Sequence, residues 1–154
     1  MDLTTILRLD AVRVTGATSS KKRLFQEFGE LSASVHGLNA DEVSSALQER
    51  EALGPTGVGQ GIALPHARLA SVDSVVGLFI RLDKSLEFEA VDRQPVDLIF
   101  ALLAPEDAGV EHLKALALVS RTMRDSQLCT KLRANSDPVT LHTLLTDAPN
   151  AKAA

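Results

Sequence analysis

Apolar side chains recur with a helical period in two stretches of the first third of the chain. Residues 21–35 carry apolar residues three and four positions apart, with charged residues on the other faces: Leu24, Phe25, Phe28, Leu31 and Val35. After Gly37, residues 39–42 have the composition of a helix start, and the following inward stripe is Val43, Ala46, Leu47 and then Arg50. The pattern predicts two consecutive amphipathic helices.

The middle of the chain holds runs that are apolar at nearly every position. Residues 75–82 and 96–104 are rich in β-branched and other apolar side chains, and residues 62–64 form a shorter run. Strands of this kind are typical of a sheet that is covered on both faces. We therefore expect a mixed sheet with helices on either side.

The final third returns to a helical pattern. One helix is predicted over about 108–124, with an apolar stripe of Val110, Leu113, Leu116, Val119 and Met123. A shorter helix starts at Ser126, and a last one is opened by Asp137 and Pro138. The order of elements predicts an α/β fold, a three-layer α/β/α sandwich built as one domain over residues 1–147, with a flexible tail over 148–154.

Composition and charge exclude several classes of function. A net charge of −4 and a pI near 5.5 argue against nucleic-acid binding. The one basic run, residues 21–23, is interpreted as a solvated face or a partner contact. Cys129 is the only cysteine, so neither an intramolecular disulfide nor a thiolate zinc site is expected. No apolar stretch suits a secretion signal or a membrane span, so we expect a cytoplasmic protein without direct membrane insertion.

Residues 54–61 contain four of the nine glycines and are expected to form a shaped loop. Their spacing fits neither a nucleotide-binding P-loop nor a dinucleotide fingerprint. The surrounding residues instead offer the parts of a phosphoryl site. Arg50 supplies a planar fork of donors, Thr56 supplies a hydroxyl, and His66 supplies a ring nitrogen whose lone pair is available at neutral pH. Such a site needs neither a metal nor another cofactor.

These residues resemble the IIA domains of the mannitol/fructose class of the phosphotransferase system (PTS), the EIIA type-2 family, and most closely its nitrogen-related regulatory form. The likeness rests on the run Thr-Gly-Val-Gly-Gln-Gly-Ile-Ala-Leu-Pro-His ending at His66, on residues 94–103, and on His112-Leu113. It implies an α/β/α sandwich, phosphorylation of His66 on the tele nitrogen, and a second histidine at His112 that stabilises the phosphoryl group. It also places Arg50 and Thr56 at phosphate-binding positions.

The resemblance implies a phosphoryl donor of the HPr or NPr kind. Regulatory targets would be proteins such as kinases, potassium transporters or transcription regulators, bound according to the phosphorylation state. Two alternatives stay open: a sugar-transport IIA component that passes phosphoryl to a IIB domain, and a purely regulatory binding module. The other histidines, His36 and His142, and Cys129 are interpreted as structural.

Overall fold

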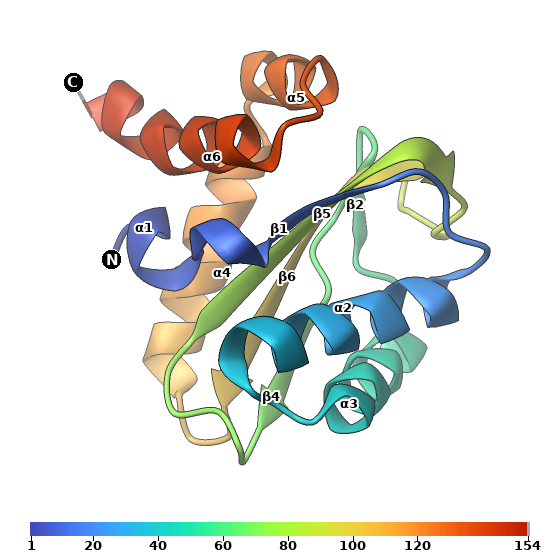
Figure 1. The fold of residues 1–154 in the computed structure, drawn as a ribbon, viewed down its shortest axis with the longest axis vertical. Coiled ribbons are helices and arrows are strands. Elements are labelled where there is room, and N and C mark those ends of the chain that lie inside the picture. The colour runs from blue at the N-terminus through green and yellow to red at the C-terminus, as the bar shows by residue number, and fades with distance from the viewer. Residues whose placement is uncertain (154) are drawn as a thin grey trace.

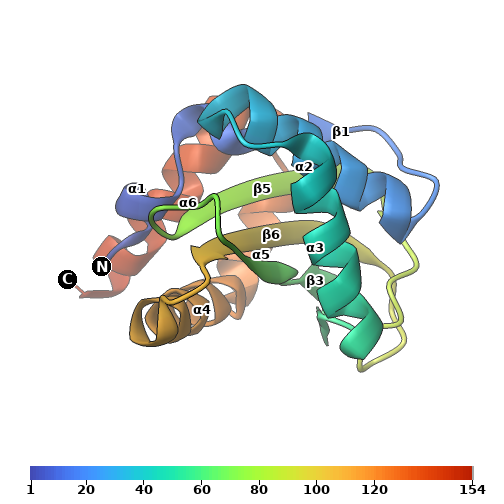
Figure 2. The same cartoon turned by 90° about the horizontal axis from the view of Figure 1, so that it is seen from below.

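The computed structural model describes the backbone of residues 1–153 and the side chains of residues 1–147, and it has three layers (Figure 1). The helices are α1 (Leu3–Ile6), α2 (Lys21–His36), α3 (Ala40–Leu53), α4 (Gly109–Met123), α5 (Ser126–Arg133) and α6 (Pro138–Ala153), with a 3-10 turn at Leu9–Ala11. The strands are β1 (Val12–Thr15), β2 (Gly57–Gly59), β3 (Ile62–Ala63), β4 (His66–Leu69), β5 (Val76–Leu86) and β6 (Val96–Pro105). Helices α2 and α3 cover one face of the sheet, and α4 and α6 cover the other (Figure 2). The predicted α/β/α sandwich is confirmed.

The sheet is mixed, with the order β1-β5-β6-β3-β2, and β4 also pairs with β6. The central pair β5 and β6 is antiparallel, whereas β1, β3 and β4 each run parallel to their neighbours β5 and β6. Strands β3 and β4 share one register on β6, since Ile62 lies opposite Leu98 and His66 opposite Leu102. They follow one another along β6 and are separated at residues 64 and 65, where Pro65 has no N–H to donate.

Three strands were not predicted from the sequence. Strand β1 alternates Val12 and Val14 with polar residues but is only four residues long. Strand β4 follows Pro65 and is equally short, with the buried Ala67 and Leu69 at alternate positions. Strand β2 lies inside the glycine-rich stretch that was expected to be a loop throughout. Pairing with β3 outweighs the low strand propensity of glycine there.

The glycines at positions 59 and 61 flank the tip of the hairpin between β2 and β3. Gly59, Gln60 and Gly61 all have positive φ, at 103°, 58° and 81°. The Asp92 carboxylate accepts the Gln60 N–H at 2.9 Å, and the Arg133 guanidinium donates to the Gln60 carbonyl at 2.7 Å. These glycines therefore form a turn that is tied to the loop before β6 and to α5.

The two predicted helices of the first third begin as expected. Ser20 accepts the Arg23 N–H at 3.1 Å, and Asn39 accepts the Glu42 N–H at 2.9 Å. The inward stripe of α3 differs at its end. The buried face of α3 ends with Glu51, four residues after the buried Leu47, and not with Arg50 as predicted. Arg50 is half-buried at the border of that face.

The apolar stripe predicted for α4 is wrong in its first half. Val110 and Leu113 are each 64% exposed, while His112, Ala115 and Val119 are buried against the sheet. Helix α4 is therefore rotated so that a histidine faces inward and two apolar side chains face outward. Of the two exposed residues, Leu113 borders the site described below.

The C-terminal tail expected at residues 148–154 lies outside the residues whose side chains are described. In the part of the chain that the structure describes, no helix combines the length and the apolar composition needed to cross a bilayer.

Candidate functional site

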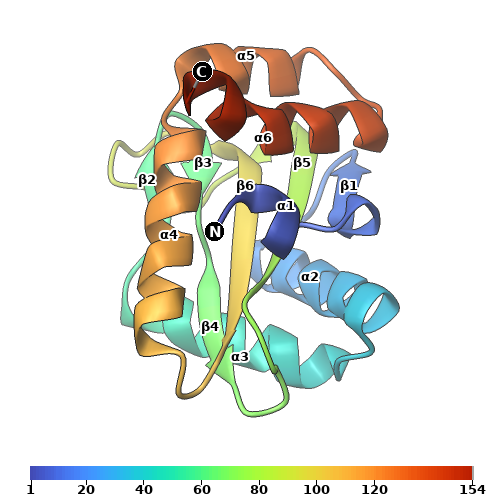
Figure 3. The ribbon, with the colours of Figure 1, turned by 90° about the vertical axis from the view of Figure 1, so that its left-hand side faces the viewer.

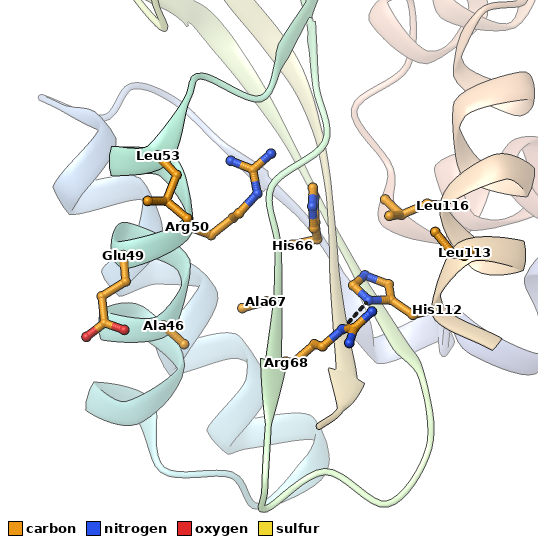
Figure 4. A pocket seen from close by; sticks show the side chains of 10 residues that line it. All are labelled: Ala46, Glu49, Arg50, Leu53, His66, Ala67, Arg68, His112, Leu113 and Leu116. Carbon is orange, nitrogen blue, oxygen red and sulfur yellow. Dashed lines mark hydrogen bonds between the residues drawn. The ribbon is translucent and has the colours of Figure 1, made fainter. Parts of the chain in front are cut away.

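Strand β4 lies at the edge of the sheet, between α3 and α4 (Figure 3). Residues of these three elements line an open hollow of about 470 Å³. Its charged and imidazole-bearing side chains come from all three elements: Glu49, Arg50, His66, Arg68 and His112. Apolar residues of α3 and α4 complete the walls (Figure 4). Of the four candidate residues predicted from the sequence, Arg50, His66 and His112 meet here, and Thr56 lines an adjoining hollow together with Arg50 and His66.

The first residue of β4, His66, is half-buried, and its ring is held by the chain just before it. Nδ1 lies 3.0 Å from the Leu64 carbonyl oxygen. A carbonyl oxygen only accepts, so Nδ1 carries the proton in this hydrogen bond. In the neutral ring the lone pair then lies on Nε2, the tele nitrogen. The break between β3 and β4 places the Leu64 carbonyl where it fixes this tautomer.

The neutral form of His66 is favoured by its surroundings. Burial lowers the pKa of His66 below its ordinary value of 6.5, and the charges of Arg50 and Arg68 lower it further. The hydrogen bond to Leu64 and the charge of Glu51 act in the opposite direction. The net result is an imidazole that keeps its nucleophilic lone pair at neutral pH.

A second imidazole, His112, faces the first from α4. The two ring centroids are 5.5 Å apart and the ring planes meet at 69°. His112 is 4% exposed, and burial, together with the charges of His66 and Arg68, lowers its pKa. Its position in the first turn of α4 agrees with the sequence prediction, and its side chain lies beside His66 rather than in solvent (Figure 4).

The guanidinium of Arg50 points toward His66 from the last turn of α3 (Figure 4). One of its terminal nitrogens donates to the Gly54 carbonyl at 2.9 Å, which holds the end of the side chain in place. The remaining N–H groups stay available for an anion in the hollow.

The role expected for Thr56 needs correction. Its hydroxyl, predicted to donate to a phosphoryl group, donates instead to Glu51 Oε1 at 2.6 Å, and its backbone N–H donates to Glu51 Oε2 at 2.9 Å. Thr56 is buried and has only one hydroxyl proton to give. In this structure Thr56 therefore anchors the loop beside Arg50, and it does not offer a free donor.

The same carboxylate also binds a lysine of the basic run. Lys21 Nζ lies 3.0 Å from Glu51 Oε2 and 4.6 Å from the centre of the Phe88 ring. The interpretation of residues 21–23 as a solvated face therefore fails for Lys21, while Lys22 and Arg23 are exposed.

Two residues of this region were missed by sequence reasoning. Arg68 donates from Nε to His112 Nδ1 at 3.1 Å. Its signal was its place two residues after His66, because alternate residues of a strand share a face. The signal for Glu51 was its helical spacing from Val43 and Leu47, which places it on the buried stripe.

The side chains interpreted as structural lie away from the hollow. His142 Nε2 is 2.9 Å from the Leu7 carbonyl oxygen, and His36 ends α2. Cys129 is buried and contacts the Met123 carbonyl. Across the described residues, no group of three or more His, Cys, Asp or Glu side chains is arranged to hold a metal ion.

A family model covers nearly the whole chain. Residues 5–148 match the family described as "Phosphoenolpyruvate-dependent sugar phosphotransferase system, EIIA 2". The chain belongs to this EIIA type-2 family.

Similar proteins carry the name nitrogen regulatory protein. The one from Bradyrhizobium diazoefficiens is 43% identical over 149 residues, covering 97% of both chains, and the one from Escherichia coli K12 is 38% identical, covering 96% of this chain and 91% of the other. The crystal structure of IIA-Ntr from Neisseria meningitidis matches this EIIA chain with a TM-score of 0.86 at 39% identity, covering 92% and 97% of the two chains. The IIA mannitol structure from Escherichia coli has a TM-score of 0.75 at 18% identity, over 90% and 97%, and shares the fold.

Proposed function

We propose that this protein is a phosphocarrier of the nitrogen-related phosphotransferase system, acting as one domain over residues 1–147. It takes a phosphoryl group onto Nε2 of His66 from a phosphohistidine protein of the HPr or NPr kind. The observation that carries the proposal is the hydrogen bond from Nδ1 to the Leu64 carbonyl, because it leaves the Nε2 lone pair free in a hollow that also holds Arg50.

The chemical step needs little beyond position and charge. A bond forms between His66 Nε2 and phosphorus while the donor's P–N bond breaks, and the electron pair of that bond stays on the donor's ring nitrogen. The positive charge that develops on the His66 ring is stabilised by the Nδ1–H hydrogen bond to Leu64. Arg50 would bind the phosphoryl oxygens, and His112 would donate a further hydrogen bond from the opposite side.

A protein donor is supported by the surface around the hollow. Leu53 is 85% exposed and Leu113 is 64% exposed, and both line the hollow that contains His66. Exposed apolar side chains that gather around a polar site are typical of a protein docking surface. A protein carrying its own phosphohistidine would cover them as it brings phosphorus to Nε2.

The regulatory part of the proposal rests on the relatives named nitrogen regulatory protein. A phosphoryl group adds roughly 1.5 to 2 negative charges to this surface and so changes which partners can dock there. The sugar-transport alternative receives less support, since the fructose-specific EIIA component of Haloferax volcanii is 29% identical.

The deciding experiment is phosphoryl uptake from phosphoenolpyruvate through the general phosphotransferase proteins, followed by intact mass. Wild type and the control His36→Ala should gain one acid-labile phosphoryl group, and His66→Ala should gain none. Uptake by His66→Ala equal to that of wild type would place the phosphoryl group elsewhere and end the proposal. Failure of all three proteins would leave the chain as a binding module.

A further inference from the structure

Arg68 connects the strand that carries the phosphoacceptor to the helix that carries the second histidine. It lies two residues after His66 on β4, and its Nε donates to Nδ1 of His112 on α4 at 3.1 Å (Figure 4). An arginine guanidinium has only donors, so His112 Nδ1 must be unprotonated in this contact. The neutral His112 ring therefore carries its proton on Nε2.

The protonated nitrogen of His112 is a buried donor that lacks a partner among the described residues. It points away from Arg68, toward the side of the hollow where His66 lies (Figure 4). Leaving a buried donor unpaired is unfavourable, and in this fold it is tolerated beside the proposed phosphoacceptor. An acceptor on His66 Nε2, such as a phosphoryl oxygen, would supply the missing partner.

We propose that Arg68 is a positioning residue that sets the tautomer of His112, so that the Nε2–H bond is directed at the phosphoryl group on His66. This inference rests on the proposed function. Without the Arg68 contact, the ring is free to carry its proton on Nδ1, and Nε2 would then turn a lone pair toward the negatively charged phosphoryl oxygens. Such a ring repels the group that it should bind.

The alternative role for Arg68 is that of a solvated cation, because Arg68 lies at an exposed position. Within the described part of the chain, however, Arg68 has no carboxylate partner, and its hydrogen bond goes to a buried imidazole. The charge of Arg68 also lowers the pKa of His112, which favours the neutral ring that the tautomer argument requires.

The first test reads the tautomer directly in the unphosphorylated protein. Ring nitrogen NMR of wild type should show His112 protonated on Nε2 alone, with its signals assigned by comparison with His112→Gln. Arg68→Met should introduce the Nδ1-protonated form, and Arg68→Lys, which keeps a donor, should restore much of the wild-type pattern. A wild-type ring protonated on Nδ1, or an Arg68→Met spectrum like that of wild type, would overturn the inference.

The second test separates an action through His112 from direct contact with phosphate. In single-turnover phosphoryl uptake, Arg68→Met should slow the reaction roughly 10- to 100-fold, as expected when a residue that orients a reacting group is lost. In the His112→Ala background the same substitution should have no further effect. Equal slowing in both backgrounds would mean that Arg68 binds the phosphoryl group itself, and the positioning role would be wrong.

The two tests also keep this inference apart from the proposed function. If wild type takes up no phosphoryl group while the tautomer responds to Arg68→Met, the phosphocarrier proposal fails and the control of His112 by Arg68 stands. If uptake is normal and the tautomer does not respond, only the inference fails. Circular dichroism of each variant checks that the fold is kept, which the exposed position of Arg68 favours.

Discussion

Lys21 and Glu51 join the first turn of α2 to the last turn of α3 through an Nζ to Oε2 distance of 3.0 Å. The Glu51 carboxylate also accepts the hydroxyl and the backbone N–H of Thr56, so one buried acid holds three donors from two segments. Arg50, which points toward His66, is the preceding residue. The geometry of the site therefore depends on an acid that does not line the hollow itself.

Replacing that acid should destabilise the fold. Glu51→Gln leaves Lys21 without its buried counter-charge and puts an amide donor among three donors. We expect a loss of about 2 kcal/mol in the free energy of unfolding. Urea denaturation measures it, and Glu49→Gln on the exposed face of the same helix should change stability by less than roughly 0.5 kcal/mol. Equal stability of the two variants would show that the Glu51 contacts contribute nothing.

Removal of the Arg50 guanidinium should slow phosphoryl uptake with little effect on folding. Arg50→Ala takes away the donors that point toward His66, and loss of one such group typically costs on the order of 100-fold in rate. Arg50→Lys should recover part of the rate, since it keeps the charge without the planar fork. Arg121→Ala, at an exposed position of α4, is the control that should react like wild type. An unchanged rate for Arg50→Ala would remove Arg50 from the site.

Stability should fall as the solution becomes acidic. Burial is the main cause that lowers the pKa of His36, His66 and His112 below 6.5. Below pH 6.5 the unfolded chain thus binds protons that the folded chain does not, so the free energy of unfolding decreases as the pH falls through this range. Well above pH 6.5 these rings are neutral in both states and add no pH dependence.

Urea denaturation at about pH 7.5 and about pH 5.5 measures this effect. The double variant His66→Gln/His112→Gln should lose less stability than wild type between the two conditions. If wild type is equally stable at both, or the double variant falls as steeply, the buried imidazoles are not the cause.

The exposed apolar residues that line the hollow, Leu53 and Leu113, should contribute to binding of the phosphoryl donor and not to the stability of the fold. Leu113→Glu places a charge on an exposed position beside His66, where it opposes both an apolar contact and an incoming phosphoryl group. We expect the apparent affinity for the phosphorylated donor to fall about tenfold or more. The dependence of uptake rate on donor concentration measures it.

Val139→Asp is the matched control, since Val139 is 54% exposed on α6. It should leave both the donor affinity and the melting temperature unchanged. A Leu113→Glu protein with wild-type donor affinity would place the docking surface away from α4.

Local sequence patterns predicted many of the helices and strands and part of the candidate site. Side-chain caps at Ser20 and Asn39 mark the starts of α2 and α3, and the continuous apolar runs mark β5 and β6. The candidate site around His66 could also be predicted, because a histidine that follows a glycine-rich loop with an arginine upstream is a local sequence pattern. These features were within reach because each is decided by residues close together in the sequence.

The missed features depend on distant parts of the chain. Arg68 and His112 are 44 residues apart and Lys21 and Glu51 are 30 apart, so neither contact has a local pattern. Helix α4 was misread for another reason. Its residues Val110 and Leu113 are apolar and exposed, and sequence periodicity cannot distinguish an apolar face that packs in the core from one that lies at the surface.

The hollow is assembled from both sides of the sheet. Arg50 comes from the layer of α2 and α3, His112 comes from the layer of α4 and α6, and His66 lies on the strand between them (Figure 4). A chain in which either helical layer has detached still carries His66 but has lost one of its two neighbours. Under the proposed function, a chain whose two layers are docked would therefore take up the phosphoryl group faster than a partially folded one, so the phosphorylated population would be enriched in fully folded molecules.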